Sequence, residues 1–402
     1  MSEWVSTRLG DVTSQVQELV KVASGTEYPL LGVKWYAEGP FLREVVTSET
    51  SKATRFYRVQ PGQFIYNRLF AWKGSFGLVG EDLAGSYVSN EFPLFDCDRT
   101  RLLPEFLSLH FGQRSVWSYV ARVSTGTTAS RNRWKESQFN DYEIALPSTA
   151  EQRRIVDVMA AVDAQVNALG AEKRRAASLL ALVRNAYPEG TECALSSVVS
   201  SIQGGKSVQA SDEKPQFGEP AVLKLSAIQL GSFVASEAKR LDDLTGYTDA
   251  HRVEEGDLLI TRASGSFDRV GYATIARNVA PQTYLPDLIW RIQTKPEVCS
   301  TTFLAHLLCS PSVRSMITSS ARGTASMRKI NKALLGSLRL PIPSSEEQSK
   351  YVRQCDAVAS EVEALDLELA DLRAFRSALL ASLLNQEIEI PEAYDALLEE
   401  VS

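Results

Sequence analysis

The residue types that most often carry out catalysis are sparse in this sequence. Its three histidines, at positions 110, 251 and 306, lie far apart, so a histidine metal site or a Ser-His-Asp triad has little to draw on. Five cysteines occur without CxxC spacing, which indicates inert thiols in a reduced, cytoplasmic protein. The segment QGGKS (203–207) resembles the end of a phosphate-binding loop, but Ser200 stands where that pattern needs glycine. We therefore predict no metal, no cofactor and no catalytic residues in this chain.

The sequence also lacks convincing motifs of two further enzyme classes, nucleases and methyltransferases. Pro286-Asp287 followed by Lys295 faintly resembles a nuclease pattern, but residues 285–293 are better interpreted as a buried strand. A methyltransferase would need an Asn/Asp-Pro-Pro-aromatic motif and a glycine-rich loop after a strand, and neither is found. An enzyme that acts alone is the weakest interpretation of the chain.

Two stretches without any acidic residue point instead to phosphate binding. Residues 106–135 and 298–345 contain no Asp or Glu, and each carries a cluster of Lys and Arg among Gly, Ser and Thr. Such side chains displace counterions from a DNA backbone, and hydroxyl and amide groups donate to phosphate oxygens. A charge cluster can also be an ordinary solvated surface, but here it recurs at equivalent places. The candidate residues are Gly126, Thr127, Arg131, Arg133 and Lys135 in the first stretch and Gly323, Thr324, Arg328, Lys329 and Lys332 in the second; Arg314 belongs to the second cluster as well.

Base recognition needs directional donors on projecting loops. Arginine can bind guanine through two hydrogen bonds, and asparagine can bind adenine in the same way. Any single polar residue of this kind could equally be an exposed side chain without a DNA contact. The candidates are Asn67, Arg68, Trp72 and Lys73 in the first half of the chain and Arg262, Ser264, Ser266 and Arg269 in the second.

The charge distribution is compatible with a DNA partner despite the net charge of −6. The last segment, residues 345–402, alone has a net charge of −10, so the remainder is neutral to mildly basic.

The N-terminus lacks the basic and apolar regions of a signal peptide, and no run of 18 uncharged apolar residues occurs. A cytoplasmic protein without a membrane association is expected.

The chain is an internal duplication. LPSTAEQRRIV (146–156) and IPSSEEQSKYV (342–352) match at an offset of 196 residues, and VQPGQFIYNR (59–68) matches VEEGDLLITR (253–262) at 194. STGTTASRNR (124–133) and SARGTASMRK (320–329) share a Gly-Thr pair in the same order. Four ordered matches, counting AASLLALVRN (176–185) with RSALLASLLN (376–385), indicate two copies of one unit.

Each copy is predicted to be an α+β domain followed by a long helix. Strand-like stretches (64–70, 257–263 and 287–293) precede a region whose apolar residues repeat every 3.5 positions. Two such seams in one chain predict that the helices pair as a coiled coil. Ser148, and Ser344 or Ser345, are the predicted N-caps. The predicted pairing residues are Met159, Val162, Val166 and Leu169 in the first helix and Val358, Val362, Leu365 and Leu369 in the second.

The expected domain boundaries follow from this pattern. They place a first recognition domain at residues 1–147, a helical spacer at 148–188, a second recognition domain at 189–343, a second spacer at 344–385 and an acidic tail at 386–402.

These repeated motifs resemble the specificity subunits of type I restriction-modification systems. The matching features are Pro-Ser/Thr-x-x-Glu-Gln opening a long helix, the EGDLLITR stretch with its following Gly-Ser, and Gly-Thr before a basic cluster. The resemblance covers the chain up to about residue 385.

The resemblance implies two tandem target-recognition domains joined by antiparallel helices. Each domain would read one half of a bipartite, asymmetric double-stranded DNA target, in the service of DNA methylation and host defence. Two methyltransferase subunits and the restriction subunits would be partners, and they would bind S-adenosylmethionine, ATP and magnesium. Two alternatives remain at this stage: a DNA reader of the same build in another defence system, and a coiled-coil scaffold that binds proteins without DNA.

Overall fold

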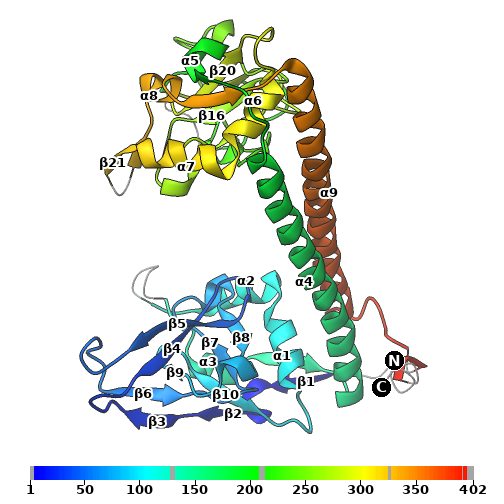
Figure 1. Ribbon diagram of the computed structural model, residues 1–402. Helices are drawn as coiled ribbons and strands as arrows, with labels where there is room; N and C mark the ends of the chain where they lie inside the picture. The colour runs from blue at the N-terminus through cyan, green and yellow to red at the C-terminus, as the bar shows by residue number, and fades with distance from the viewer. Residues whose placement is uncertain (1–3, 127–131, 208–212, 325–326, 392, 396–402) are drawn as a thin grey trace. The chain divides into compact units, whose positions relative to one another are not determined.

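The computed structural model describes residues 4–126, 132–207, 213–324, 327–391 and 393–395, and divides into two compact units. Unit 1 comprises residues 1–168 and 369–402, and unit 2 comprises residues 169–368. Each unit combines one α+β domain with the beginning of one long helix and the end of the other (Figure 1). The compact units are therefore not the two sequence repeats. Each takes helical residues from both.

The domain of unit 1 contains three β-sheets, of two, four and five strands. Strand β1 (Val5–Arg8) pairs with β11 (Glu143–Leu146), and a four-stranded sheet has the order β2-β10-β7-β8. A five-stranded sheet has the order β3-β6-β9-β4-β5, in which β4 and β9 are parallel. The remaining elements are β2 (Thr13–Val16), β3 (Glu18–Lys21), β4 (Tyr28–Val33), β5 (Pro40–Val46), β6 (Arg55–Arg58), β7 (Phe64–Tyr66), β8 (Phe76–Leu78), β9 (Tyr87–Val88), β10 (Leu94–Cys97), α1 (Pro104–Phe111), α2 (Arg114–Val123) and α3 (Glu136–Asn140).

Unit 2 repeats the central part of this plan. Strand β12 (Thr191–Ala194) pairs with β23 (Arg339–Ile342), and the four-stranded sheet β13-β20-β16-β18 has the same order as its counterpart. Two three-stranded sheets, β15-β14-β19 and β17-β22-β21, complete it. The elements are α5 (Leu195–Val198), β13 (Val199–Gly204), β14 (Ala221–Leu223), β15 (Ala238–Arg240), β16 (Leu258–Thr261), β17 (Ala263–Ser264), β18 (Ala273–Ile275), β19 (Thr283–Tyr284), β20 (Ile289–Thr294), α6 (Thr301–Leu308), α7 (Pro311–Ser320), β21 (Arg322–Thr324), β22 (Met327–Lys329) and α8 (Lys332–Gly336).

The predicted strand at residues 64–70 is shorter in the structure. Strand β7 ends at Tyr66 because the Asn67 side chain accepts a hydrogen bond from the Leu69 amide at 2.9 Å and turns the chain. The strands predicted at 257–263 and 287–293 correspond to β16 and β20.

The two long helices are α4 (Thr149–Asn185) and α9 (Ser345–Leu384). At 1.5 Å per residue they extend for about 55 and 60 Å. Ser148 and Ser344 cap them, each accepting a bond of 3.3 Å from the backbone amide of Glu151 or Glu347. The predicted α+β fold with two long packed helices is confirmed.

Each unit's core is closed by both helices. In unit 1, Ile155 and Met159 near the start of α4 and Leu380 and Leu383 near the end of α9 join one apolar core. In unit 2, Tyr351 and Cys355 of α9 lie in the core, and Val183 of α4 packs against it. The start of one helix meets the end of the other in each unit, so the pairing is antiparallel.

A buried glutamine attaches each long helix to its own domain. The Gln152 amide nitrogen donates to Arg101 O (2.8 Å) and Pro147 O (3.0 Å), and its oxygen accepts from the Leu103 amide at 2.8 Å. The side chain of Gln348 repeats this arrangement with Val298 O, Pro343 O and the Ser300 amide. Both residues are at most 3% exposed. The glutamine of the repeated Pro-Ser-x-x-Glu-Gln motif therefore has a structural role.

Among the described residues, no helix is both long and apolar enough to cross a membrane.

We predict that Gln152→Ala destabilises unit 1 by about 2–4 kcal/mol, because it leaves a buried amide and two buried carbonyls without partners. Urea denaturation followed by tryptophan fluorescence measures this, since five of the six tryptophans belong to unit 1. Gln165→Ala, at an exposed position of α4 in the same unit, is the control and should change stability by less than about 0.5 kcal/mol. Equal effects of the two substitutions would contradict the structural role of Gln152.

Candidate DNA interface

In both units, the predicted base-reading loop lies against the predicted basic segment. The loop after β7 is joined to the basic segment by a hydrogen bond from Trp134 N to Arg68 O at 3.1 Å. The loop after β16 is joined in the same way by a bond from Ile330 N to Arg262 O at 2.9 Å. The fold therefore places the two groups of candidate residues side by side, once in each unit.

The basic segment contains paired strands in unit 2 and a single antiparallel bridge in unit 1. In unit 2, β21 pairs with β22, with Arg322 opposite Lys329, and β22 also pairs with β17. In unit 1, an isolated bridge joins Thr125 to Arg133 at the equivalent place. Thr127 and Arg131 lie outside the described residues, as does the side chain of Thr324. Gly126 is exposed, and Gly323 has a φ of +140°, which favours glycine there.

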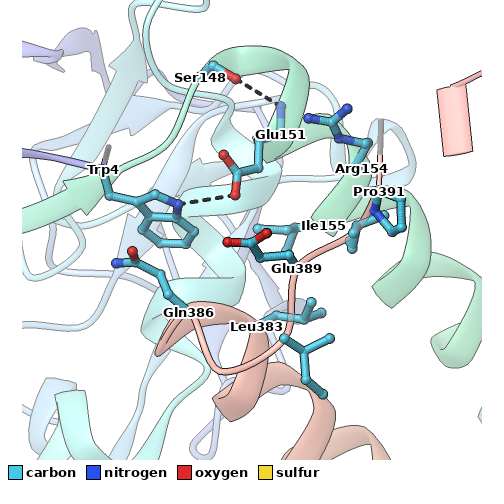
Figure 2. A pocket seen from close by; sticks show the side chains of 11 residues that line it. Trp4, Ser148, Glu151, Arg154, Ile155, Leu383, Gln386, Glu389 and Pro391 are labelled. Carbon is cyan, nitrogen blue, oxygen red and sulfur yellow. Dashed lines mark hydrogen bonds between the residues drawn. The ribbon is translucent and has the colours of Figure 1, made fainter. Parts of the chain in front are cut away.

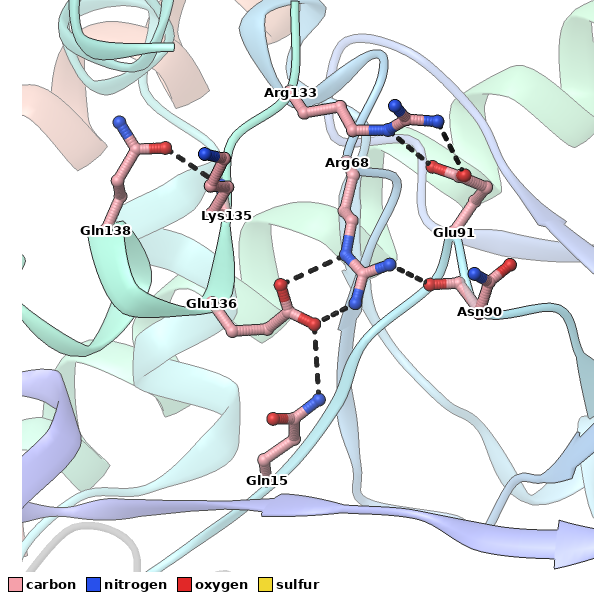
Figure 3. Close-up of polar contacts among 8 residues, drawn as sticks. All are labelled: Gln15, Arg68, Asn90, Glu91, Arg133, Lys135, Glu136 and Gln138. Atoms are coloured by element: carbon pink, nitrogen blue, oxygen red, sulfur yellow. Dashed lines mark hydrogen bonds and ion pairs between the residues drawn. The ribbon is translucent and has the colours of Figure 1, made fainter. Parts of the chain in front are cut away.

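Arg68 is held inside unit 1 by acidic and carbonyl oxygens (Figure 3). Its guanidinium forms a two-pronged ion pair with Glu136, with Nε 3.1 Å from Oε2, and also donates to Asn90 O. The Arg68 and Glu136 side chains are 18% and 23% exposed. A guanidinium engaged in this way supports the loop and has few donors left for a base.

The other candidates in the loop of unit 1 divide into structural and exposed residues. Asn67 is occupied by its turn hydrogen bond. Trp72 is 37% exposed and donates from its indole nitrogen to Leu69 O at 3.0 Å. The Lys73 ammonium lies 3.7 Å from the centre of the Trp35 ring. The sequence analysis did not single out Trp35.

Each part of the unit 1 surface has one arginine paired with an acid: Glu136 binds Arg68 of the loop, and Glu91 binds Arg133 of the basic segment. Arg133 forms an ion pair with Glu91 at 2.8 Å, and these hydrogen bonds raise the pKa of the guanidinium (Figure 3). Lys135 is exposed at the start of α3. Sequence reasoning missed Glu91 and Glu136, although Glu136 is the first acidic residue after the acid-free stretch and begins a helix, where a carboxylate is favoured.

The loop of unit 2 is held by different contacts. The Arg262 guanidinium lies 5.8 Å from the Trp290 ring, and Arg269 donates to the Gln229 side chain at 3.0 Å. The Ser264 hydroxyl accepts from the Ser266 amide at 3.1 Å and forms a turn. Ser266 is exposed, while Arg262 and Arg269 are half-buried.

The hairpin of unit 2 is more cationic than its counterpart. Arg322, Lys329 and Lys332 are exposed, and Arg328 is half-buried. Lys332 begins α8 where Glu136 begins the equivalent α3. One repeat therefore places a lysine where the other places the glutamate that holds Arg68.

The expectation that Arg314 contributes to the basic surface is wrong. Arg314 is 8% exposed and donates to Val270 O at 2.6 Å and Asp268 O at 2.7 Å. Burial lowers its pKa. Its charge supports the loop that ends in β18, so residue type alone misplaced it.

The predicted helix-pairing residues form a protected stripe within each unit. Met159 and Leu369 of unit 1 and Leu169 and Leu365 of unit 2 are at most 5% exposed. The four valines, Val162, Val166, Val358 and Val362, are half-buried. Ion pairs flank the stripe: Arg376 with Asp163 in unit 1, at 2.8 Å for Nη2, and Lys173 with Asp366 in unit 2.

Of the histidines at equivalent positions 110 and 306, His306 is buried and His110 is half-buried. Burial lowers the pKa of His110 to about 4, and its Nε2 lies 2.8 Å from the Tyr142 hydroxyl. Burial also lowers the pKa of His306, which accepts from Arg184 at 3.3 Å and contacts Asp356 at 2.8 Å. Both rings thus contribute to the packing of α1 and α6. In the described part of the chain, no group of three His, Cys, Asp or Glu side chains is arranged to bind a metal.

A cavity of about 280 Å³ lies in unit 1, where α4 begins and α9 ends (Figure 2). The Trp4 indole donates to Glu151 at 3.1 Å, and Arg154, 7% exposed, pairs with Asp395 of the acidic tail at 3.1 Å. Ile390 of the tail packs against the core. The described part of the tail is therefore an integral part of unit 1.

The relative and the solved structures that resemble this chain all come from type I restriction-modification systems. No family model matches the chain. The specificity subunit of the type I restriction enzyme EcoKI from Escherichia coli (strain K12) is 22% identical over 297 residues, which cover 68% of this chain and 63% of that relative. The match thus spans less than two thirds of the relative's length.

Two solved structures share the fold over nearly the whole chain. A chain from work on complex assembly and conformational transition of the type I restriction-modification system has a TM-score of 0.54 at 19% identity, and the match covers 95% of this chain and 97% of that one. The S subunit of the type I system from M. genitalium has a TM-score of 0.53 at 13% identity, with 95% and 96% covered. The structure is thus a duplicated α+β protein joined by paired helices. Its fold is that of the type I restriction-modification specificity subunits, as the repeated motifs predicted.

We predict that Arg68 and Glu136 are coupled more strongly than Arg133 and Glu91, because the first pair is less exposed and two-pronged. Double-mutant cycles with Arg→Met and Glu→Gln, measured by urea denaturation, should give about 1–2 kcal/mol for Arg68–Glu136. The more exposed pair should give a clearly smaller coupling, because water and salt screen it. A negligible coupling for Arg68–Glu136 would return Arg68 to the candidate base readers.

Proposed function

We propose that the chain is the DNA-recognition subunit of a type I restriction-modification system and reads a bipartite, asymmetric target. The observation that carries this proposal is the recurrence, in both units, of a donor-bearing loop bonded through its backbone to a basic segment. A single such surface could be accidental. Two surfaces at equivalent places in a duplicated fold are what a reader of two half-sites requires.

The two parts of each surface suit different parts of the DNA. Exposed Arg and Lys side chains on the basic segment neutralise phosphates and position the duplex. We propose that exposed polar side chains of the adjoining loop, such as Ser266 in unit 2, meet base edges in a groove. Because Arg68 and Arg133 are paired with acids and Lys329 and Lys332 are exposed, we expect unit 2 to contribute more of the electrostatic affinity.

The helices are proposed to dock the catalytic partners. Leu179, Leu182, Leu367 and Phe375 on α4 and α9 are 51–70% exposed, and apolar side chains repeated along a helix suit a protein interface. We propose that two methyltransferase subunits and the restriction subunits bind to this chain in the cytoplasm. S-adenosylmethionine, ATP and magnesium would be bound by those partners, and this chain would be non-catalytic.

The first experiment is co-expression with the methyltransferase subunit that the chain is proposed to bind, followed by selection from a random DNA pool at two salt concentrations. We expect enrichment of two short sequence blocks around a fixed gap. Salt-sensitive binding without enrichment would contradict sequence recognition. No binding in the presence of the methyltransferase would favour the protein-binding scaffold instead.

We further predict that Lys329→Gln weakens binding to the selected target and to unrelated DNA by a similar factor. It should also lower the slope of log affinity against log salt concentration by about 1, because one phosphate contact is lost. Lys350→Gln, which removes the same charge from an exposed position of α9, is the matched control. Fluorescence anisotropy across a salt series measures both. An unchanged slope for Lys329→Gln would place the phosphate contact elsewhere.

A further inference from the structure

An exposed aromatic cluster adjoins the base-reading loop of unit 1. It comprises Trp35 (41% exposed), Tyr36 (61%), Phe70 (37%) and Trp72 (37%), with Lys73 above the Trp35 ring. The Trp35 and Phe70 rings are 5.5 Å apart, and Tyr36 lies 6.0 Å from Trp117 of α2. Large aromatic side chains seldom remain this exposed together unless they bind something. Among the described side chains of unit 2, Phe217 is the one comparably exposed aromatic residue.

The turn that presents these rings is strained. Tyr36 and Ala37 both have left-handed backbones, with φ of 60° and 56°, between β4 and β5. Glycine or asparagine is the usual choice for such positions. The surrounding structure holds the turn through hydrogen bonds from Tyr36 N to Lys73 O (2.9 Å) and from Ala37 N to Gly74 O (2.7 Å). Strain retained at a largely exposed tyrosine points to a functional requirement for a ring at that place.

The chemistry of the cluster matches a nucleobase. Lys73 places a positive charge on the aromatic surface, which suits the edge of a polyanion better than an apolar protein segment. Aromatic rings beside a cation are the common means of binding the flat face of an unstacked base. The loop that carries Phe70, Trp72 and Lys73 also carries Asn67 and Arg68, so the rings belong to the surface that we assign to DNA.

We infer that the Trp35–Tyr36 turn, with Phe70, Trp72 and Lys73, stacks on an unstacked base of the half-site bound by unit 1. This inference rests on the proposed function. In a regular duplex the base faces are covered by their neighbours, so the rings can reach one only where a step is kinked or a base is displaced. Recognition by unit 1 then includes a local deformation of the DNA, whereas unit 2 relies on its cationic hairpin.

A matched pair of variants separates stacking from simple apolar contact. Tyr36→Phe keeps the ring, and Tyr36→Leu keeps an apolar side chain without a ring; both retain a Cβ and the same backbone strain. Because Tyr36 is largely exposed, thermal unfolding of both variants should match that of the parent chain. We expect Tyr36→Leu to weaken DNA binding on the order of 10-fold with an unchanged salt slope, and Tyr36→Phe to bind like the parent.

The decisive probe is a set of duplexes that carry the selected target with one mismatched pair, moved step by step through both half-sites. A mismatch lowers the cost of unstacking, so the parent complex should bind more tightly at one step of a single half-site. Tyr36→Leu should lose this gain, and Tyr36→Phe should keep it. No gain at any step, or a gain that survives in Tyr36→Leu, overturns the inference.

The outcomes also distinguish this inference from the proposed function. If the parent complex selects no split motif, the proposed function itself fails. If it selects one and Tyr36→Leu binds it normally, only the stacking surface fails. If Tyr36→Leu loses the methyltransferase while its DNA affinity is unchanged, the cluster is a protein interface and the inference is overturned.

Discussion

The structure depends on one interaction that is made twice, the burial of a glutamine amide where each long helix begins. Gln152 and Gln348 each bond three backbone groups of the domain that precedes the helix. The direction in which α4 and α9 leave their domains is therefore set by hydrogen bonds in a dry environment, where an unpaired amide would be costly. Each glutamine therefore fixes a domain to the beginning of its own helix.

The same attachment explains why the compact units differ from the sequence repeats. Each helix begins in its own domain and ends against the other repeat's domain, where Leu383 and Val183 meet the cores. Each core buries apolar side chains from the beginning of one long helix and from the end of the other, so both helix ends are needed to cover it. A duplicated sequence thus yields two units that are each completed by the other copy.

The two candidate DNA surfaces are alike in backbone and different in charge. Arg68 O and Arg262 O accept equivalent hydrogen bonds, yet Glu136 stands where the other repeat has Lys332. Exposed rings accompany the more neutral surface, and exposed cations accompany the other. Duplication followed by such changes lets one scaffold present two chemistries, which an asymmetric target demands.

The sequence by itself determined the duplication, the α+β class, the long helices with their serine caps and the resemblance to specificity subunits, because repeats, periodicity and caps are local patterns. It also located the loop and the basic segment that pack together. Only the tertiary structure decided which charges are available: Arg68 is bound by Glu136, Arg314 is buried, and Trp35 and Tyr36 lie beside Lys73. These relations join residues that are distant in sequence, and a side chain's partners depend on packing that residue type does not encode.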